Sequence, residues 1–417
     1  MIKLDEKKVE GMLDQHWNWF CTYVLTKKLK IEIDPSDFSK DKEITYEEFI
    51  NEYFDWDKKA LEKIIKVKPN KIKDLADENK EYYKAFEKGE KKVKLNNLKF
   101  PIIDDEQKEE TKKESKERKY KNHSDVILNL FGYNDFLRGY APWGSYQKGW
   151  GAYAFTKELG VDVCPYCNRQ YIFTISEQNI DESKKEKKTV KYLKESKNGR
   201  PEIDHFYPKA EYPYLSCSLF NFIPSCHPCN HQKKDSFNKK LNDDNKKKHK
   251  NLKFDGDYAR LLYPYEEGFS VPKKIAQFKL SRRKCSDPEY NEKKYKIIIE
   301  PENDNGLEIN NKIKNAIEAF HLEELYNLHQ LELDELVEGC RDYSEAKRIS
   351  LAKMIANAIG NDKTVNGLIE FYKKRIKNIV FSLPRDTAKN YILQQLKEDL
   401  VEQFKTIDYD PQKMNIE

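Results

Sequence analysis

The chain has 417 residues, enough for two or three compact units with cores of their own. Its 38% apolar content, with 26 Tyr and 21 Phe, excludes a wholly disordered protein. The net charge of +5 is a small difference between 77 basic and 72 acidic residues, so any affinity for nucleic acid must come from local clusters of basic side chains.

Membrane and secretory features are not evident in the sequence. No run of 18 apolar residues occurs, and the first 20 residues lack the charged-then-apolar order of a signal peptide. We therefore expect a cytoplasmic protein with no membrane partner.

The N-terminal region, residues 1–103, is predicted to be helical. Val9, Met12 and Leu13 follow helical spacing, and "TYEE" at 45–48 is a capping-box pattern ahead of an apolar stripe. Residues 104–122 carry almost no apolar side chains. They form either a solvated helix or a flexible linker, and the composition favours a charged linker.

Two further regions follow, at 123–255 and 256–417. The first holds the motifs that carry chemistry. The second begins with two β-like runs, "AQFKL" and "YKIIIE", and is otherwise mainly helical, with an apolar stripe at Ile313, Ala316, Ile317 and Phe320.

Four of the eight cysteines form two CxxC pairs, Cys164 with Cys167 and Cys226 with Cys229. Two such knuckles complete a tetrahedral four-thiolate zinc site. A redox role is a weaker interpretation, because two copies are present and no βαβ pattern surrounds either, and chance burial is weaker still. We predict a structural Zn²⁺, which has no open position for chemistry. His227, inside the second knuckle, is not needed as a ligand.

Between the knuckles lie Asp204, His205 and Asn221, and Asn230 follows the last cysteine. Extended runs are expected near 201–206 and 214–223, and a helix from about 227 to 240. A carboxylate and an amide oxygen are hard ligands suited to Mg²⁺ or Mn²⁺, and a neutral histidine can take a proton from water near pH 7. Asn221 has the donors and the acceptor to tie a loop beside the histidine. An Asp-His pair alone is more often structural, so the prediction depends on its neighbours.

The segments "CPYC", "EIDHFYPK" and "NFIPSCHPCNHQKKD" together resemble the HNH endonuclease family, the zinc-knuckle branch of the ββα-metal nucleases, over about residues 160 to 240. The resemblance implies an α+β protein whose central ββα nuclease domain, within 123–255, is flanked by helical N- and C-terminal regions. It also implies that His205 is the general base, Asp204 a metal ligand, Asn221 the loop brace and Asn230 the last ligand of the catalytic ion. His231 adjoins that position and is the alternative ligand.

Within that family, "CPYCNRQ" and "DHFYPK" are similar to the HNH nucleases of bacterial anti-phage systems of the Septu and retron type. This narrower resemblance implies an ABC- or AAA-type ATPase partner. DNA is the expected substrate, and an RNA- or tRNA-cleaving toxin and a non-catalytic nucleic-acid-binding scaffold are the alternatives.

Basic side chains near the motifs are candidate nucleic-acid contacts, namely Arg169, Lys209, Lys233 and Lys234. For Arg169 a structural ion pair is an equal alternative. The lysines at 244–250 are better explained as a solvated loop. His16 and His329 have no partner pattern, and Trp150 is expected to be a core or interface residue.

Overall fold

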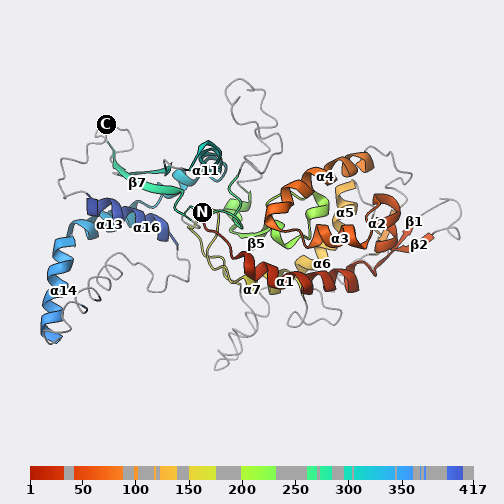
Figure 1. Cartoon of the computed structure of the whole chain (residues 1–417), viewed down its shortest axis with the longest axis horizontal. Coiled ribbons are helices and arrows are strands. Elements are labelled where there is room, and N and C mark those ends of the chain that lie inside the picture. Colours follow the sequence, from red (N-terminus) through yellow and green to blue (C-terminus); the bar gives the residue numbers. More distant parts are fainter. Residues whose placement is uncertain are drawn as a thin grey trace, which may run out of the picture. The chain divides into compact units, whose positions relative to one another are not determined.

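The computed structural model describes residues 1–31, 42–87, 98–101, 117–118, 123–138, 150–174, 199–231, 261–269, 273–283, 295–302, 305–342, 345–359 and 392–406, with single residues at 367 and 371. These residues fall into two compact units (Figure 1). The N-terminal unit comprises Leu4–Val161 and Phe173–Pro224. The C-terminal unit comprises Met1–Lys3, Asp162–Ile172 and Ser225–Glu417. Residues of the predicted region 123–255 thus occur in both units.

The N-terminal unit is mostly helical and also contains short strands. Its helices are α1 (Glu6–Trp19), α2 (Tyr46–Phe54), α3 (Lys58–Ile65), α4 (Pro69–Glu87), α5 (His123–Leu130), α6 (Tyr133–Arg138) and α7 (Ala152–Leu159), with a π-helical turn η1 (Phe20–Val24) and 3₁₀ turns η4 (Pro213–Leu215) and η5 (Leu219–Asn221). Its strands are β1 (Lys28–Ile31), β2 (Lys42–Thr45), β3 (Leu98–Pro101), β4 (Glu117–Arg118), β5 (Glu202–His205) and β6 (Phe222–Ser225), the last of which ends at the unit boundary.

Helix α2 begins where the sequence predicts, and two other helices of this unit have side-chain caps. Thr45 and Glu48 form the expected capping box of α2, and the side chains of Asp5 and Asp57 cap α1 and α3. Between α5 and α6, Gly132 adopts a φ of +67°, and a Cβ there would lie 2.6 Å from Val24 Cγ2. Only glycine fits this turn. The turn places Tyr133, the first residue of α6, in contact with His205 at the end of β5.

Strands in the first 103 residues correct the purely helical interpretation of that region. β1 pairs antiparallel with β2 and β3, and β3 pairs with β4, in the order β2-β1-β3-β4. β4 lies within the predicted linker 104–122, whose other residues lie outside the described part of the chain. These strands have only two to four residues, so the apolar alternation in β1 is too short to indicate a strand from the sequence alone.

A second sheet pairs β5 with β6. The extended run expected near 201–206 is confirmed as β5, but the one expected over 214–223 is wrong in its first part. There the chain makes the turns η4 and η5 before β6 begins at Phe222. Pro213 at the start of η4 favours a turn, and the turns aim successive carbonyl groups at side-chain donors. Residues 227–231 are helical, and the rest of the helix predicted to 240 lies outside the described residues.

The C-terminal unit combines a hairpin with helices. Its elements are β7 (Ala276–Arg282), β8 (Tyr295–Pro301), α11 (Leu307–Ala319), α12 (Leu322–Tyr326), α13 (Gln330–Asp342), α14 (Glu345–Ile359) and α16 (Gln394–Thr406). The two β-like runs are confirmed as β7 and β8, which pair antiparallel with Phe278 opposite Ile299. Ile313, Ala316 and Phe320 are buried, as their helical spacing predicts.

Side chains from helices occupy the outer edges of the β7–β8 hairpin. From α16, Asp399 accepts a hydrogen bond from the N–H of Phe278, and Gln403 bonds both the N–H and the C=O of Leu280. Beside β8, Asn327 bonds both backbone groups of Ile297. The carboxamides take the place of neighbouring strands, so the two-stranded sheet keeps few open backbone groups on these edges. None of the described helices combines the length and the apolar composition that crossing a bilayer requires.

Candidate functional site

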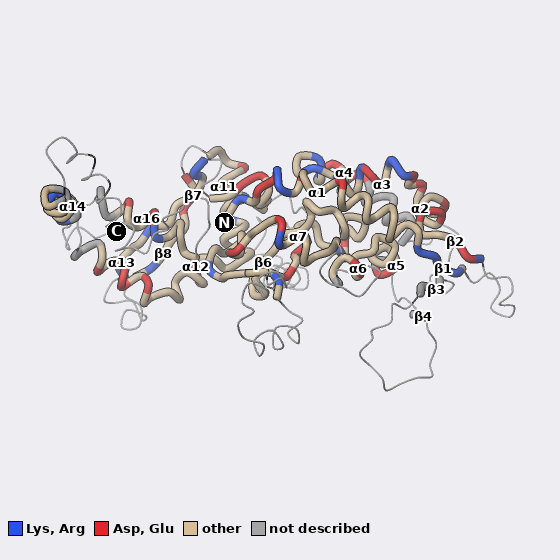
Figure 2. Tube along the Cα trace, turned by 90° about the horizontal axis from the view of Figure 1, so that it is seen from below, with Lys and Arg blue, Asp and Glu red and all other residues tan. Residues whose placement is uncertain are grey.

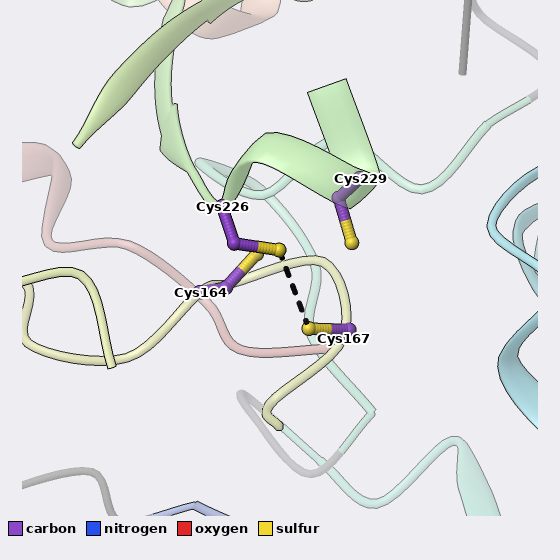
Figure 3. A group of neighbouring side chains, drawn as sticks. All are labelled: Cys164, Cys167, Cys226 and Cys229. Atoms are coloured by element: carbon purple, nitrogen blue, oxygen red, sulfur yellow. Dashed lines mark hydrogen bonds between the residues drawn. The ribbon is translucent and has the colours of Figure 1, made fainter. Parts of the chain in front are cut away.

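The four knuckle cysteines converge within the C-terminal unit. All four are buried and free of disulfide bonds, and their Sγ atoms lie within 4.8 Å of one another (Figure 3). The Sγ atoms of Cys167 and Cys226 are 3.9 Å apart. Four sulfurs placed tetrahedrally at about 2.3 Å from a zinc ion are separated by about 3.8 Å. The cluster therefore has the donors and the spacing to hold a zinc ion.

The first knuckle is shaped by a tight turn. The N–H of Asn168 donates to the carbonyl of Cys164 at 2.8 Å, and the N–H of Cys164 donates to the carbonyl of Gln170 at 2.9 Å. Asn168 takes a left-handed conformation with a φ of +52°, which asparagine tolerates better than most residues. The second knuckle lies at a helix start, where the N–H of Asn230 donates to the carbonyl of Cys226 at 3.1 Å.

Residues of the C-terminal helices contact the first knuckle through hydrogen bonds and ring stacking. The hydroxyl of Tyr326 donates to the carbonyl of Cys167 at 2.7 Å, and the N–H of Leu393 donates to the carbonyl of Asn168 at 2.7 Å. The ring of Tyr166 stacks on Phe320 at 4.3 Å between centroids. These contacts join the zinc-ligand loop to α11, α12 and the segment before α16, so the cluster is part of the core of its unit.

Electrostatics within the cluster favour thiolates at Cys167 and Cys226, whose pKa values are both lowered, over those at Cys164 and Cys229. Hydrogen bonds from the Cys164, Cys226 and Cys229 thiols lower the pKa of Cys167, whereas burial raises the pKa of Cys164. Four thiolates without a cation would repel one another in this buried place. A divalent cation that replaces the remaining protons satisfies all four sulfurs at once.

In the N-terminal unit, Asp204 and His205 occupy the end of β5. Both side chains are buried, with exposed fractions of 3% and 6%. The Nε2 of His205 lies 3.1 Å from the carbonyl oxygen of Ser216. Because a carbonyl can only accept, Nε2 carries the proton, and the lone pair of the neutral ring is on Nδ1. This tautomer makes Nδ1 the atom that can take up a proton.

Asn221 ties the segment after His205 to the loop that follows η4. Its Oδ1 accepts from the N–H of Tyr207 at 2.7 Å, and its Nδ2 donates to the carbonyls of Tyr207 and Leu215, both at 3.0 Å. The backbone carbonyl of Asn221 accepts from the N–H of Phe206 at 2.9 Å. Asn221 is fully buried, and these contacts are the kind of loop brace that its position in the sequence predicts.

An aromatic ring and a cation flank His205. The ring of Tyr133, at the start of α6, meets the imidazole edge-on at 4.9 Å between centroids, and Phe222 contacts it at 5.3 Å. The ammonium of Lys209 lies 4.3 Å from the centroid of the Tyr133 ring. Lys209 is thus brought beside the Asp204–His205 pair, whereas Tyr133 had no signal in the sequence beyond its being aromatic. Burial raises the pKa of Tyr133, so its hydroxyl stays protonated at neutral pH.

The last candidate ligands, Asn230 and His231, lie in the C-terminal unit. Asn230 is buried with an exposed fraction of 7%, and His231 is exposed. The rings of His227 and His231 lie one helical turn apart with their centroids separated by 4.0 Å. Asp204 belongs to the N-terminal unit.

The predicted nucleic-acid contacts have different surroundings. The Nε of Arg169 donates to the Nε2 of His329 at 2.8 Å, and the Nδ1 of His329 donates to a carboxylate oxygen of Glu332 at 3.1 Å. This chain of contacts favours the structural alternative for Arg169. Lys233 and Lys234 lie outside the described residues, as do the lysines at 244–250.

His16 and Trp150, to which the sequence assigned no functional role, form hydrogen bonds next to the loop that contacts His205. His16 of α1 donates from Nε2 to the carbonyl of Cys217 at 2.6 Å, and Trp150 donates from Nε1 to Nδ1 of His16 at 2.7 Å. The two bonds require a neutral imidazole, and burial lowers the pKa of His16 from 6.5 to about 4. His16 is 201 residues from Cys217, so no local pattern could have revealed the pair.

The lysines around one surface cavity of the N-terminal unit are paired with carboxylates and do not form an open anion site. A surface cavity of about 390 Å³ between α3 and α4 is lined by Lys63, Lys66, Lys68 and Lys71. Figure 2 shows basic and acidic residues mixed along these helices. Each lysine of the cavity is within ion-pair distance of a carboxylate, in the pairs Lys63–Glu78, Lys66–Asp14, Lys66–Glu62, Lys68–Glu10 and Lys71–Asp74.

Searches with protein-family models, against curated proteins and against solved structures return no significant match to this chain.

Proposed function

We propose that this chain is a metal-dependent HNH-type endonuclease that hydrolyses phosphodiester bonds in DNA. The observation that carries the proposal is the hydrogen bond from His205 Nε2 to the Ser216 carbonyl, which holds the imidazole in the tautomer of a general base at a strand end. Three features support it. Asp204 adjoins the histidine, Asn221 braces the loop, and the order of β5, β6 and the helical residues 227–231 is that of a ββα motif.

In the proposed mechanism, Nδ1 of His205 takes a proton from the attacking water. The Ser216 carbonyl stabilises the imidazolium that results, because it accepts the hydrogen bond from Nε2–H. Lys209, held over Tyr133, contributes positive charge where the phosphate would lie. Asp204 provides a donor suited to Mg²⁺ or Mn²⁺, and the sequence resemblance assigns Asn230, or His231 in its place, as the further ligand. When bound, that ion would stabilise the charge on the leaving oxygen.

The cysteine cluster has a separate role in this proposal. Four thiolates complete the coordination of zinc, so the ion has no position open to water or phosphate. Because the cluster lies in the core of the C-terminal unit, its zinc would hold the fold together. Catalysis then belongs to the Asp204–His205 centre alone.

The test is cleavage by the His205→Ala variant. We expect purified protein with Mg²⁺ or Mn²⁺ to cut plasmid DNA, and the variant to lose about 100- to 10,000-fold in rate while keeping its zinc and its fold. His321→Asn is a matched control, because His321 is exposed and asparagine tolerates the left-handed conformation that His321 adopts, with a φ of +49°. A His205→Ala variant that cuts as fast as the parent would refute the mechanism.

The same assay separates the alternatives. Cleavage of total RNA or tRNA in preference to plasmid and single-stranded DNA would indicate an RNA-cleaving toxin. Binding of nucleic acid with no cleavage under any divalent ion would indicate a scaffold. The further proposal of an ABC- or AAA-type ATPase partner in anti-phage defence rests on sequence resemblance, and co-purification with the product of a neighbouring ATPase gene tests it.

A further inference from the structure

Three consecutive carbonyl groups, beginning with that of the last residue of η4, each accept a hydrogen bond from a different side chain. Leu215 accepts from Asn221 Nδ2 at 3.0 Å, Ser216 from His205 Nε2 at 3.1 Å, and Cys217 from His16 Nε2 at 2.6 Å. Neighbouring carbonyls share a Cα atom, so the direction of one constrains the direction of the next. The Ser216 carbonyl, which orients His205, is therefore constrained by the hydrogen bonds to the carbonyls of Leu215 and Cys217 on either side of it.

His16 is the one of these three donors that comes from the N-terminal helix. It is fully buried, its ring stacks on Trp19 at 5.3 Å with an interplanar angle of 17°, and Trp150 donates to its Nδ1. The indole donor forces the imidazole proton onto Nε2, which is the atom facing Cys217. Trp150 thus stabilises the Nε2–H tautomer of His16, which can donate to the Cys217 carbonyl of the loop.

Losing the His16 donor would leave the carbonyl of Cys217 buried without this partner. Cys217 is fully buried, so water cannot easily replace the bond. The peptide unit would turn toward another donor, and the adjoining Ser216 carbonyl would turn with it. His205 would then no longer be held with its proton on Nε2.

We propose that His16, locked by Trp150, is a positioning residue of the His205 centre, acting through the Cys217 and Ser216 carbonyls. The proposal rests on the nuclease function proposed above, and it gives the N-terminal helix a part in catalysis. His16 touches neither substrate nor metal. Its effect should appear in kcat, because substrate contacts are unchanged and only the orientation of the base is altered.

Two variants of His16 test this in the full-length chain. His16→Leu removes the donor, and His16→Gln retains an amide N–H near the position of Nε2. We expect His16→Leu to lower kcat about 10- to 100-fold with KM for DNA within a factor of about two, as for a small misplacement of a catalytic group. His16→Gln should restore most of the loss. Phe49→Leu, a core change in α2 of the same unit, controls for lost stability.

A second measurement does not depend on activity. Imidazole ¹⁵N shifts of His205 at neutral pH should report the Nε2–H tautomer in the parent and in His16→Gln, and a mixture of tautomers in His16→Leu. If His16→Leu does not fold, Trp150→Phe tests the same link, because loss of the indole donor frees the tautomer of His16. Unchanged kcat and unchanged His205 shifts, or a loss of kcat no larger than that of Phe49→Leu, would overturn the proposal. A parent without nuclease activity but with the predicted shifts would refute only the proposed function.

Discussion

The cysteine cluster and the His205 centre both gather polar side chains from distant parts of the chain, but they satisfy them differently. In the cluster, four sulfur atoms lie close enough together to hold a metal ion. Around His205, each donor already has a backbone carbonyl, at Leu215, Ser216 and Cys217. We therefore expect the stability of the first centre to depend on a metal and that of the second to depend on the loop conformation. Each difference can be tested by substituting residues of one centre and then measuring the zinc content and the stability of the variant.

Removing the zinc ligands should have the largest effect. In the Cys226→Ser, Cys229→Ser double variant, we expect zinc to be lost and the C-terminal unit to lose its cooperative unfolding, because structural zinc contributes on the order of 10 kcal/mol. Zinc content by mass spectrometry and thermal unfolding measure this. Cys21→Ser is the control, since Cys21 is half-buried and lies outside the cluster. Parental zinc content and stability in the double variant would contradict a structural metal site.

Asn221→Ala should affect the other centre. It removes hydrogen bonds to the N–H and the carbonyl of Tyr207 and to the carbonyl of Leu215 in a fully buried place. We expect a loss of about 3–4 kcal/mol in the free energy of unfolding, since each unsatisfied buried group costs about 1–3 kcal/mol and relaxation recovers part of it. Chemical denaturation measures the loss, and zinc content should stay at the parental value.

The exposed asparagine of α2 provides the comparison for this variant. Asn51→Ala should change stability by less than about 0.5 kcal/mol, as surface substitutions usually do. An Asn221→Ala variant as stable as Asn51→Ala would show that the loop is held by packing and not by the carboxamide. Loss of zinc in Asn221→Ala would show that the two centres are not independent.

The two centres also differ in how much of them the sequence reveals. The cysteines are separated by fixed short spacings, and the geometry of a tetrahedral ion predicts that the two pairs meet. Asp204, His205 and Asn221 could be singled out from residue type and order. The loop carbonyls could not, because they are backbone groups whose direction depends on the turns η4 and η5, and the sequence favoured an extended run there.

Long-range partners were the other limit of the sequence. The His16–Cys217 contact and the carboxamides along β7 and β8 join residues that are far apart in the chain, and each is an ordinary polar residue on a helix until the tertiary structure brings it to a backbone group. Helices α1, α2 and α11 and the strands β7 and β8 followed from the sequence pattern, whereas the sheet of the short strands β1 to β4 did not.

The smallest predicted effect is the pH dependence that His16 contributes to the N-terminal unit. Burial lowers the pKa of His16 to about 4 in the folded chain, against 6.5 for an unperturbed histidine. Between these values the unfolded state binds the additional proton, so this contribution is complete above about pH 6.5 and declines as the pH falls toward 4. The difference of about 2.5 pH units corresponds to about 3 kcal/mol at most.

Comparison with His16→Gln isolates this contribution, because glutamine does not titrate and the other ionisable groups are common to both proteins. The difference in unfolding free energy between parent and variant should shrink by about 1.4 kcal/mol per pH unit below pH 6.5, measured by denaturant unfolding from pH 7.5 to 4.5. A difference that is constant over this range would mean that the pKa of His16 is the same in the folded and unfolded states. Protonation would then remove the bond from Trp150 to Nδ1 already near pH 6.5, and the carbonyl contacts around His205 would no longer depend on a neutral imidazole in the N-terminal helix.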